Sequence, residues 1–365
     1  MNVCIIGDGL TSLSLAKNLI NKKINVHIYY KKIANDFSSS RTIGISKHNI
    51  EYYEKNILKL HKKIKWQIKK IDIFSEKIKK NKILNFENNN ETLFYMIRND
   101  VLYKSLNEKL SESKFCKKKI IKKNFFYEKL LKKNNYDIII NCDQNNPISK
   151  KYFTRKIIKD YKNFAYTTIL EHEKLKNNSA IQVFTSLGPI AFLPISNTKT
   201  SVVCSLDTNN KNYNDNEILK LINKSNPKFK VKKNSKINCF ALKSSNLRKY
   251  YHENILAFGD LLHKIHPLAG QGFNMTIRDI EDLSNIIQNK INLGLQLDSL
   301  IFDEFQRKTK NRNFIFSNGI DFIYEFFNFD TNINGNNLSK ILKYIGSNKN
   351  FMKSAIKFAD KGLSI

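Results

Sequence analysis

The stretch from Gly259 to Asp279, GDLLHKIHPLAGQGFNMTIRD, constrains the fold of this chain more than any other segment. It follows the apolar run Asn254 to Phe258, which predicts a buried strand, and it leads into a helical pattern near Phe273. Asp260 would therefore stand at the carboxyl end of a strand, where open α/β sheets bind their ligands. The segment predicts a ligand site in an α/β lobe.

Small residues precede the predicted helix of this segment. Gly270 and Gly272 flank Gln271 and would let the backbone approach a flat ring closely. The N-terminus of the following helix would point at that ring, and a helix N-terminus stabilises negative charge. Asp260 can accept hydrogen bonds from the hydroxyl groups of a ligand. These features together favour a flat ligand that carries hydroxyls and gains negative charge.

The first thirty residues predict a strand, a glycine turn, a helix and a second strand. The turn, Gly7-Asp8-Gly9, opens the sequence GDGLTS, which fits the start of the GxGxxG dinucleotide fingerprint. In that fingerprint the turn brings a helix N-terminus to a pyrophosphate. Ser12 replaces the third glycine, and Tyr30 stands where an acid would bind the adenosine ribose. Taken alone, the turn fits a nucleotide site and an ordinary βα connection equally well.

The remaining sequence predicts two interleaved lobes followed by helices. Short β-like runs between residues 65 and 90 and between 151 and 245 predict an antiparallel sheet. The spacing of apolar residues from Leu93 to Leu110 predicts one helix, entered through Arg98-Asn99-Asp100. The predicted fold is α/β with α+β elements, divided into a Rossmann-like lobe (1–64, 91–150 and 246–290), a β-rich substrate domain (65–90 and 151–245) and a C-terminal helical region (291–365).

The chain is strongly basic, with 63 basic and 32 acidic residues and a formal net charge of +31 over 365 residues. Only seven of the basic residues are arginine, so lysine dominates the charge. Two interpretations stay open. One is a solvated lysine surface, and the other is attraction to an acidic partner or an anionic membrane face, near which each basic residue contributes about 1 kcal/mol. We expect no nucleic-acid binding, because the sequence contains no known nucleic-acid module.

The cysteines predict a reduced protein. Their number is odd and no CxxC pair occurs. They are Cys4, Cys116, Cys142, Cys204 and Cys239. No run of about 20 apolar residues is present, and the chain opens with a strand pattern instead of a signal peptide. We therefore expect a cytoplasmic protein that does not span a membrane, with association at the cytoplasmic membrane face as the second interpretation.

Two other patterns have competing interpretations. His263 and His266 could suggest a metal pair, but no third ligand lies nearby in sequence, so we expect loop histidines and no metal. The aromatic-rich stretch from Phe314 to Phe327 is typical of a helix. It fits either the core or a surface that meets lipid or a partner protein.

The segment Gly259 to Asp279 closely resembles the second FAD-binding motif of the class A FAD-dependent aromatic hydroxylases, in particular those of ubiquinone biosynthesis. The matching residues are Gly259, Asp260, His263, His266, Pro267, Gly270, Gln271, Gly272, Asn274, Arg278 and Asp279. The segment that begins at Arg41 is similar to a family segment whose arginine approaches the FAD phosphates. Residues 96 to 102, which include Arg98, look like the family helix that reaches the flavin.

The resemblance implies an FAD-dependent monooxygenase that uses NAD(P)H and O2 to hydroxylate an aromatic ring. The implied substrate is a hydrophobic polyprenyl phenol of ubiquinone biosynthesis, and other proteins of that pathway are implied partners. Because the cofactor carries the chemistry, we assign no catalytic side chain. The residues expected to bind the cofactor are Gly7, Gly9, Ser12, Arg41, Arg98, Asp143, Gly259, Asp260, Pro267, Gly270, Gln271, Gly272 and Asn274.

Three positions depart from the family pattern. Ser12 and Tyr30 alter the N-terminal fingerprint, and Gln144 replaces the glycine of an Asp-Gly motif while Asp143 keeps its acid. These departures leave two alternatives open. One is a catalytically silent, flavoprotein-like scaffold subunit of a quinone-biosynthesis complex. The other is a different flavin oxidoreductase that acts on isoprenoids.

Overall fold

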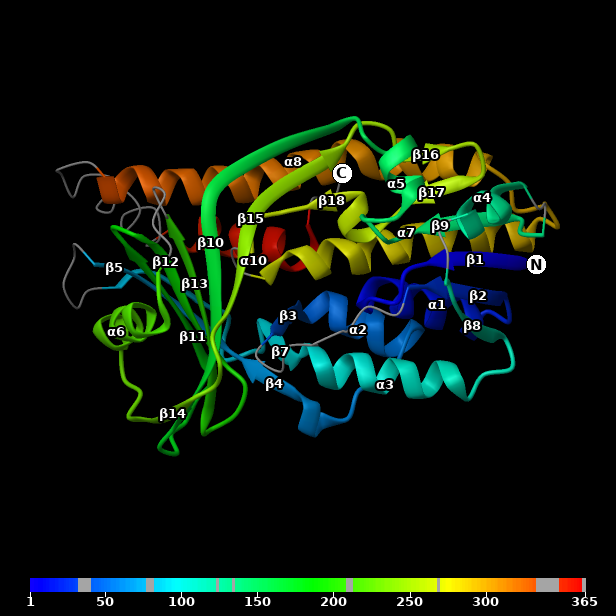
Figure 1. Cartoon of the computed structure of the whole chain (residues 1–365). Coiled ribbons are helices and arrows are strands. Elements are labelled where there is room, and N and C mark those ends of the chain that lie inside the picture. The colour runs from blue at the N-terminus through cyan, green and yellow to red at the C-terminus, as the bar shows by residue number, and fades with distance from the viewer. Residues whose placement is uncertain are drawn as a thin grey trace.

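The computed structural model describes residues 1–31, 41–76, 82–122, 125–132, 135–207, 213–267, 270–332 and 348–362. Two lobes lie side by side, and the long helix α8 (Leu300–Asn332) runs along both of them (Figure 1). One lobe contains a mostly parallel sheet with helices, and the other contains a large, mostly antiparallel sheet. The α/β class with an antiparallel second sheet, predicted from the sequence, is confirmed.

The first lobe is built on a six-stranded sheet in the order β16-β17-β9-β1-β2-β8. All neighbouring pairs are parallel except the hairpin of β16 and β17. The strands are β1 (Asn2–Ile6), β2 (Asn25–Tyr30), β8 (Cys116–Ile120), β9 (Ile138–Asn141), β16 (Tyr251–His252) and β17 (Ile255–Ala257). Every residue of β9 and β17 is buried, which accounts for their apolar sequences, in which Asn141 is the one polar residue.

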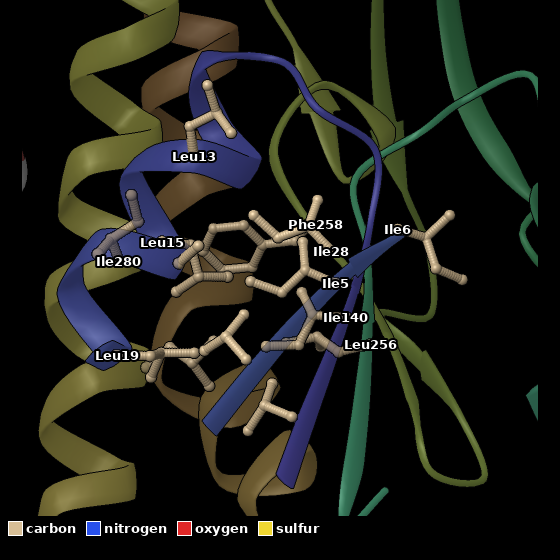
Figure 2. Packing of buried hydrophobic residues seen from close by; sticks show 14 of the residues in the cluster. Ile5, Ile6, Leu13, Leu15, Leu19, Ile28, Ile140, Leu256, Phe258 and Ile280 are labelled. Atoms are coloured by element: carbon tan, nitrogen blue, oxygen red, sulfur yellow. The ribbon is translucent and has the colours of Figure 1, made fainter. Parts of the chain in front are cut away.

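Helices α1 (Leu10–Asn21) and α7 (Gly272–Asn292) cover one face of this sheet. Leu15 and Leu19 of α1 lie one turn apart and face the sheet together with Ile280 of α7, where Ile5 and Ile140 meet them (Figure 2). Each such fully buried aliphatic side chain contributes roughly 1.5–3 kcal/mol. The helical spacing of the leucines thus fixes which face of α1 meets the strands.

The second lobe contains a nine-stranded sheet. Along its path the strands are β18 (His263–Lys264), β15 (Asn238–Leu247), β10 (Lys156–His172), β13 (Lys199–Asp207), β12 (Gly188–Pro194), β11 (Ser179–Thr185), β5 (Lys70–Ser75) and β6 (Lys82–Glu87), with β14 (Val231–Asn234) beside β10. Only β5 and β11 pair in parallel. Strands β10 and β15 curve out of this sheet toward the first lobe (Figure 1). Helix α6 (Asp215–Ser225) packs on the sheet through Ile218 and Ile222.

A third, three-stranded sheet corrects one sequence prediction. It has the order β3 (Thr42–Ser46), β7 (Phe94–Arg98) and β4 (Lys65–Ile68). The single helix predicted from Leu93 to Leu110 is therefore wrong in its first part, because residues 94–98 pair with two strands. Helix α3 (Asn99–Ser111) begins only after them. Strand pairing with distant segments outweighs the local helical spacing here.

Shorter elements complete the first lobe. They are the helices α2 (Lys47–Asn56), α4 (Phe125–Lys132) and α5 (Pro147–Tyr152) and the 3-10 turns Lys62–Ile64 and Gly259–Leu261. All five cysteines are free thiols. No helix within the described residues is long and apolar enough to cross a membrane.

The C-terminal region predicted to be helical contains α8 and α10 (Lys349–Lys361). Residues 333–347, which fall in the same prediction, lie outside the described part of the chain. In α8, Phe316 and Ile320 are buried, whereas Phe322 is 69% exposed. The aromatic stretch therefore supplies both core and surface, and a contact of its exposed face with lipid or a partner protein stays a prediction.

Candidate functional site

Three turns predicted to hold the cofactor meet at one edge of the six-stranded sheet, after β1, β9 and β17. Gly7 has φ +112°, and a Cβ atom there would lie 3.1 Å from the Ser12 hydroxyl and 3.5 Å from the backbone N of Asp143. Gly259 has φ +63°, and a Cβ there would stand 2.6 Å from a methyl group of Thr11. The first and third turns therefore touch and require glycine at these two positions.

The turn after β1 leaves space above it. Its backbone is fixed by a hydrogen bond of 2.8 Å from the N–H of Gly7 to the carbonyl of Tyr29. Gly9, the N-cap of α1, provides no side-chain cap, and a Cβ on it would meet nothing within 4 Å. The first N–H groups of α1 have no partner inside the helix, so the turn can receive an anion.

A cavity of about 610 Å³ lies where the two lobes meet. The predicted residues that line it are Arg41, Asp260, Pro267, Gly270, Gln271, Gly272 and Asn274. The predicted residues outside this lining are Gly7, Gly9, Ser12, Arg98, Asp143 and Gly259. The structure thus separates the predicted set into cavity residues between the lobes and residues of the turns at the sheet edge, with Arg98 at the end of β7.

The two predicted arginines differ in their surroundings. The guanidinium of Arg41 lies 5.1 Å from the ring centroid of Phe240, at the cavity. Arg98 instead forms a bidentate ion pair with Asp100. Its Nη2 donates to Oδ2 over 2.5 Å and its Nε donates to Oδ1 over 3.1 Å. Arg41 is therefore placed to reach a ligand in the cavity, whereas the guanidinium of Arg98 is engaged at the start of α3.

The start of α7 carries two buried amide side chains, of which one is held by hydrogen bonds and the other has an oxygen without a partner among the described residues. Asn274 donates to the carbonyl of Gly44 over 2.9 Å and accepts from the backbone N of Ser46 over 3.0 Å, so it ties α7 to β3. Gln271 lines the cavity, is 7% exposed, and its Oε1 has no hydrogen-bond partner among the described residues. A buried acceptor without a partner is costly, and an N–H group of a bound ring would satisfy it.

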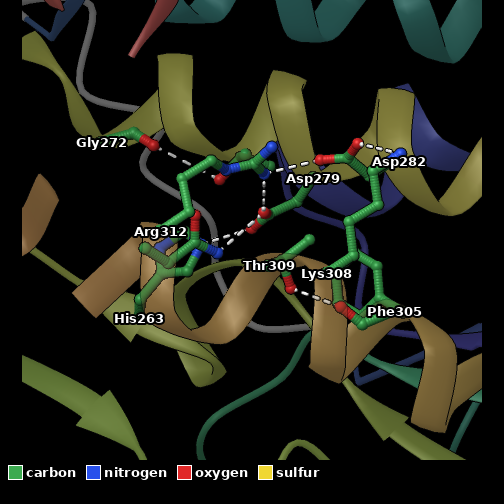
Figure 3. Close-up of polar contacts among 10 residues, drawn as sticks. His263, Gly272, Asp279, Asp282, Phe305, Lys308, Thr309 and Arg312 are labelled. Carbon is green, nitrogen blue, oxygen red and sulfur yellow. Dashed lines mark hydrogen bonds and ion pairs between the residues drawn. The ribbon is translucent and has the colours of Figure 1, made fainter. Parts of the chain in front are cut away.

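A buried polar network holds the far end of the same segment. Figure 3 shows Asp279 and Asp282 of α7 facing His263 of β18 and Arg312 of α8. Asp279 pairs with His263 and also accepts a hydrogen bond of 2.9 Å from Asn313, and the nearest guanidinium nitrogen of Arg312 lies 2.6 Å from Asp282. Because Asp279 is fully buried, a negative charge on it would be stabilised by these partners instead of by water. The network joins β18, α7 and α8 beside the cavity.

His266 lies in an aromatic cluster. Its ring stacks on Tyr324 with centroids 4.2 Å apart and meets the edge of Tyr161 at 4.9 Å. Burial, and to a lesser extent the charge of Lys159, lowers the pKa of His266 to about 3, so the imidazole is neutral. Within the described ranges, no three His, Cys, Asp or Glu side chains come close enough together to hold a metal ion.

The C-terminal helix contributes cavity residues that sequence reasoning missed. They are Ala355, Ile356, Phe358, Ala359 and Asp360 of α10. The Asp360 side chain accepts a hydrogen bond of 2.8 Å from the backbone N of His48 at the start of α2, and the ring of Phe358 lies 4.9 Å from that of Phe316. The amphipathic pattern of residues 349–361 could have indicated packing, but not which surface the helix covers.

Comparisons with known proteins agree with this arrangement. Residues 154–294 match a family model described as an FAD binding domain. The chain is 22% identical over 419 residues to the mitochondrial ubiquinone biosynthesis monooxygenase COQ6 of Dictyostelium discoideum, covering 89% of this chain and 84% of that protein. It is 29% identical over 153 residues to 3-demethoxyubiquinol 3-hydroxylase of Escherichia coli (strain K12), covering 40% of this chain and 39% of that protein.

Solved structures share the whole fold. The p-nitrophenol 4-monooxygenase PnpA from Pseudomonas putida DLL-E4 superposes with a TM-score of 0.78 at 12% identity, covering 99% of this chain and 98% of that one. PqsL from Pseudomonas aeruginosa superposes with a TM-score of 0.70 at 12% identity, covering 94% and 99%. At such low identity these structures establish the likeness of the fold alone.

Proposed function

We propose that the chain is a class A FAD-dependent monooxygenase that hydroxylates an aromatic ring of a polyprenyl-phenol intermediate in ubiquinone biosynthesis, with NAD(P)H as reductant and O2 as cosubstrate. The observation that carries the proposal is the segment from Gly259 to Asp279. Most of its matching residues line a cavity between the lobes or anchor the walls of that cavity. The ubiquinone-biosynthesis names of the sequence relatives support the choice of pathway.

The residues of the cavity fit an FAD cofactor. Asp260, after β17, would accept hydrogen bonds from the ribityl hydroxyls, and the unpaired Oε1 of Gln271 would accept one from a ring N–H. Positive φ at Gly270, +63°, lets the loop bring its backbone close to the ring. The N-terminus of α7 would stabilise negative charge on the ring. When bound, FAD supplies the redox and oxygen-activating chemistry.

The remaining walls of the cavity suit a hydrophobic aromatic substrate. Phe316 and Ile320 of α8, Phe358 of α10 and Leu242 of β15 line it. Its volume lies within the range of about 300–1,000 Å³ that is common for small-molecule sites. Apolar walls exclude water from a reacting ring, and they contribute binding free energy in proportion to the apolar area that the substrate buries.

The proposal includes a peripheral contact with a membrane, where a prenylated substrate would reside, and association with other proteins of the pathway. Exposed apolar side chains of α8, Phe322 at 69% and Ile315 at 49%, are available for such contacts. The COQ6 relatives carry the word mitochondrial in their names, so the cytoplasmic location expected from the sequence stays a prediction.

A visible absorption spectrum and an oxidation assay test this function and separate it from a silent scaffold. We expect purified protein to bind FAD, and a prenylated phenol to stimulate NAD(P)H oxidation together with O2 uptake. Failure to bind FAD after reconstitution would rule out the mechanism. Bound FAD with no substrate-dependent oxidation of NAD(P)H would favour the scaffold. The altered residues Ser12, Tyr30 and Gln144 suggest this alternative. Analysis of the product would distinguish hydroxylation of the ring from a reaction on the isoprenoid chain.

A further inference from the structure

The end of β2 carries an aromatic residue where dinucleotide-binding folds place an acid. The usual acid accepts hydrogen bonds from the adenosine ribose. Tyr30 occupies this position, and the ammonium of Lys118, on the adjacent strand β8, lies 4.9 Å from the centroid of its ring. The position therefore holds a cation over an aromatic face instead of a carboxylate. A bound ribose needs an acceptor from another element.

Asp8 supplies a carboxylate in the neighbouring turn. It lies between the two glycines of the turn after β1 and is half-buried. Among the described side chains, only Tyr103 of α3 donates a hydrogen bond to it, over 3.5 Å, and no described lysine or arginine forms an ion pair with it. Burial raises the pKa of Asp8, while the charge of Lys118 and the hydrogen bond from Tyr103 lower it. The carboxylate thus retains acceptor capacity for a ligand.

Helix α3 holds the groups around this carboxylate in place. The Nζ of Lys118 donates to Oδ1 of Asn107 over 2.7 Å, and Asn107 lies one turn after Tyr103 on α3. The positive charge is therefore fixed near Asp8 and Tyr30 at the carboxyl edge of the sheet. The open space at Gly9 adjoins the same turn. An acceptor, a fixed cation and an open helix N-terminus lie together where the fingerprint places adenosine diphosphate.

We propose that Asp8 binds the ribose hydroxyls of the adenosine half of FAD, in place of the acid that is missing at Tyr30. The inference rests on the proposed binding of FAD and assigns a role to a residue inside the altered fingerprint. The positive charge of Lys118 favours the ionised form of the carboxylate. The change at Tyr30 is therefore a relocation of the ribose acceptor from the end of β2 to the turn after β1, and the adenosine end of the site stays functional.

The test compares FAD with FMN, which lacks the adenosine half. Apoprotein of the wild type and of Asp8→Asn is titrated with each flavin, and flavin fluorescence reports the Kd. A hydrogen bond to a charged group contributes about 1.5–3 kcal/mol, so the Kd for FAD is expected to rise about ten- to a hundredfold in the variant. The Kd for FMN is expected to stay within about twofold. Glu108→Gln, an exposed change on α3, is the matched control and leaves both values unchanged.

An unchanged Kd for FAD in Asp8→Asn, or an equal rise for FMN, would overturn the assignment. If Asp8→Asn does not fold, Asp8→Ser carries the same prediction. Wild-type protein that binds neither flavin would contradict the proposed function itself. Wild-type protein that binds FAD, with a variant that binds it equally well, would contradict only the role of Asp8.

Discussion

The turn after β1 and the loop after β17 serve the same proposed ligand, but the protein holds them in different ways. The segment from Gly259 to Asp279 ends in a buried network, in which Asp279 pairs with His263 of the same segment and with Asn313 of α8. The turn from Gly7 to Ser12 is held by a backbone hydrogen bond at Gly7, and it contains the half-buried acid Asp8 and open space at Gly9. Substitutions in the loop should therefore lower the free energy of unfolding. Substitutions at Asp8 and Gly9 in the turn should instead weaken ligand binding. This difference explains how the turn can lose fingerprint residues and keep its fold.

The largest effect is expected from Asp279→Asn. The substitution removes a fully buried charge that is paired with His263 and approached by Arg312. His263 loses its carboxylate partner, whereas Arg312 keeps Asp282. Removal of one partner from a buried pair typically costs about 3–5 kcal/mol. Urea unfolding of the apoprotein measures the loss. Asp8→Asn is the comparison from the turn, and a loss in Asp279→Asn no greater than in Asp8→Asn would break the contrast between the two regions.

A pair of glycine substitutions sharpens the same contrast. Gly259→Ala would place a methyl group 2.6 Å from Thr11 at a positive φ, so the free energy of unfolding should fall by about 1–3 kcal/mol. A Cβ atom on Gly9 would meet nothing within 4 Å, and Gly9 has φ −72°. The free energy of unfolding should therefore change by less than about 0.5 kcal/mol in Gly9→Ala. The added methyl group at Gly9 should still weaken FAD binding. Equal destabilisation of both apoproteins would contradict the contrast.

Acid should lower the free energy of unfolding because it protonates His266 in the unfolded chain. The folded pKa is about 3, whereas the unfolded pKa is about 6.5, so below pH 6.5 protons bind the unfolded chain preferentially. The contribution of neutral His266 to the free energy of unfolding is complete above pH 6.5 and is lost as the pH falls toward 3. Between pH 7 and 5 the wild type should lose about 1–2 kcal/mol more unfolding free energy than His266→Phe. Parallel pH profiles for the two proteins would show that His266 titrates normally.

The smallest effect is expected from Ser12→Gly, which restores the third fingerprint glycine. Ser12 is 1% exposed in the first turns of α1, so the change removes a small buried side chain and adds backbone freedom, at a cost of about 0.5–1 kcal/mol. Because serine is already small enough for helix and strand to pack closely, the Kd for FAD should change by less than about threefold. A much tighter complex would show that Ser12 impairs the turn.

Local patterns made part of this structure predictable. The strand, turn and helix after Asn2 and the helix after Gln271 follow from apolar spacing and glycine placement, which act within a few residues. Strand β7 could not be predicted, because residues 94–98 are extended only through pairing with β3 and β4. The contact between Asp360 and His48 joins segments 312 residues apart, so no local pattern reveals that α10 lines the cavity.

The candidate site was predictable to a similar degree. Asp260 and Gln271, which the motif predicts to bind the cofactor, line the cavity, and their contact with the cofactor stays a prediction. The partner of a side chain was harder to foresee, because Arg98 pairs with its neighbour Asp100 instead of facing the cavity. The role proposed for Asp8 depends on Lys118, which is a neighbour only after β8 pairs with β2. Residue type and spacing predict which turns form a site, whereas the charges around each turn depend on the assembled sheet.

Incorporation of oxygen from isotopically labelled O2 is the most direct test of the central claim. FAD-loaded protein is supplied with NAD(P)H, a prenylated phenol and ¹⁸O2, and the product is examined by mass spectrometry. The proposed monooxygenase places one labelled oxygen atom on the aromatic ring for each turnover and requires both FAD and the reductant. Bound FAD with no oxygen added to the ring, or ring oxygen that derives from water, would contradict it.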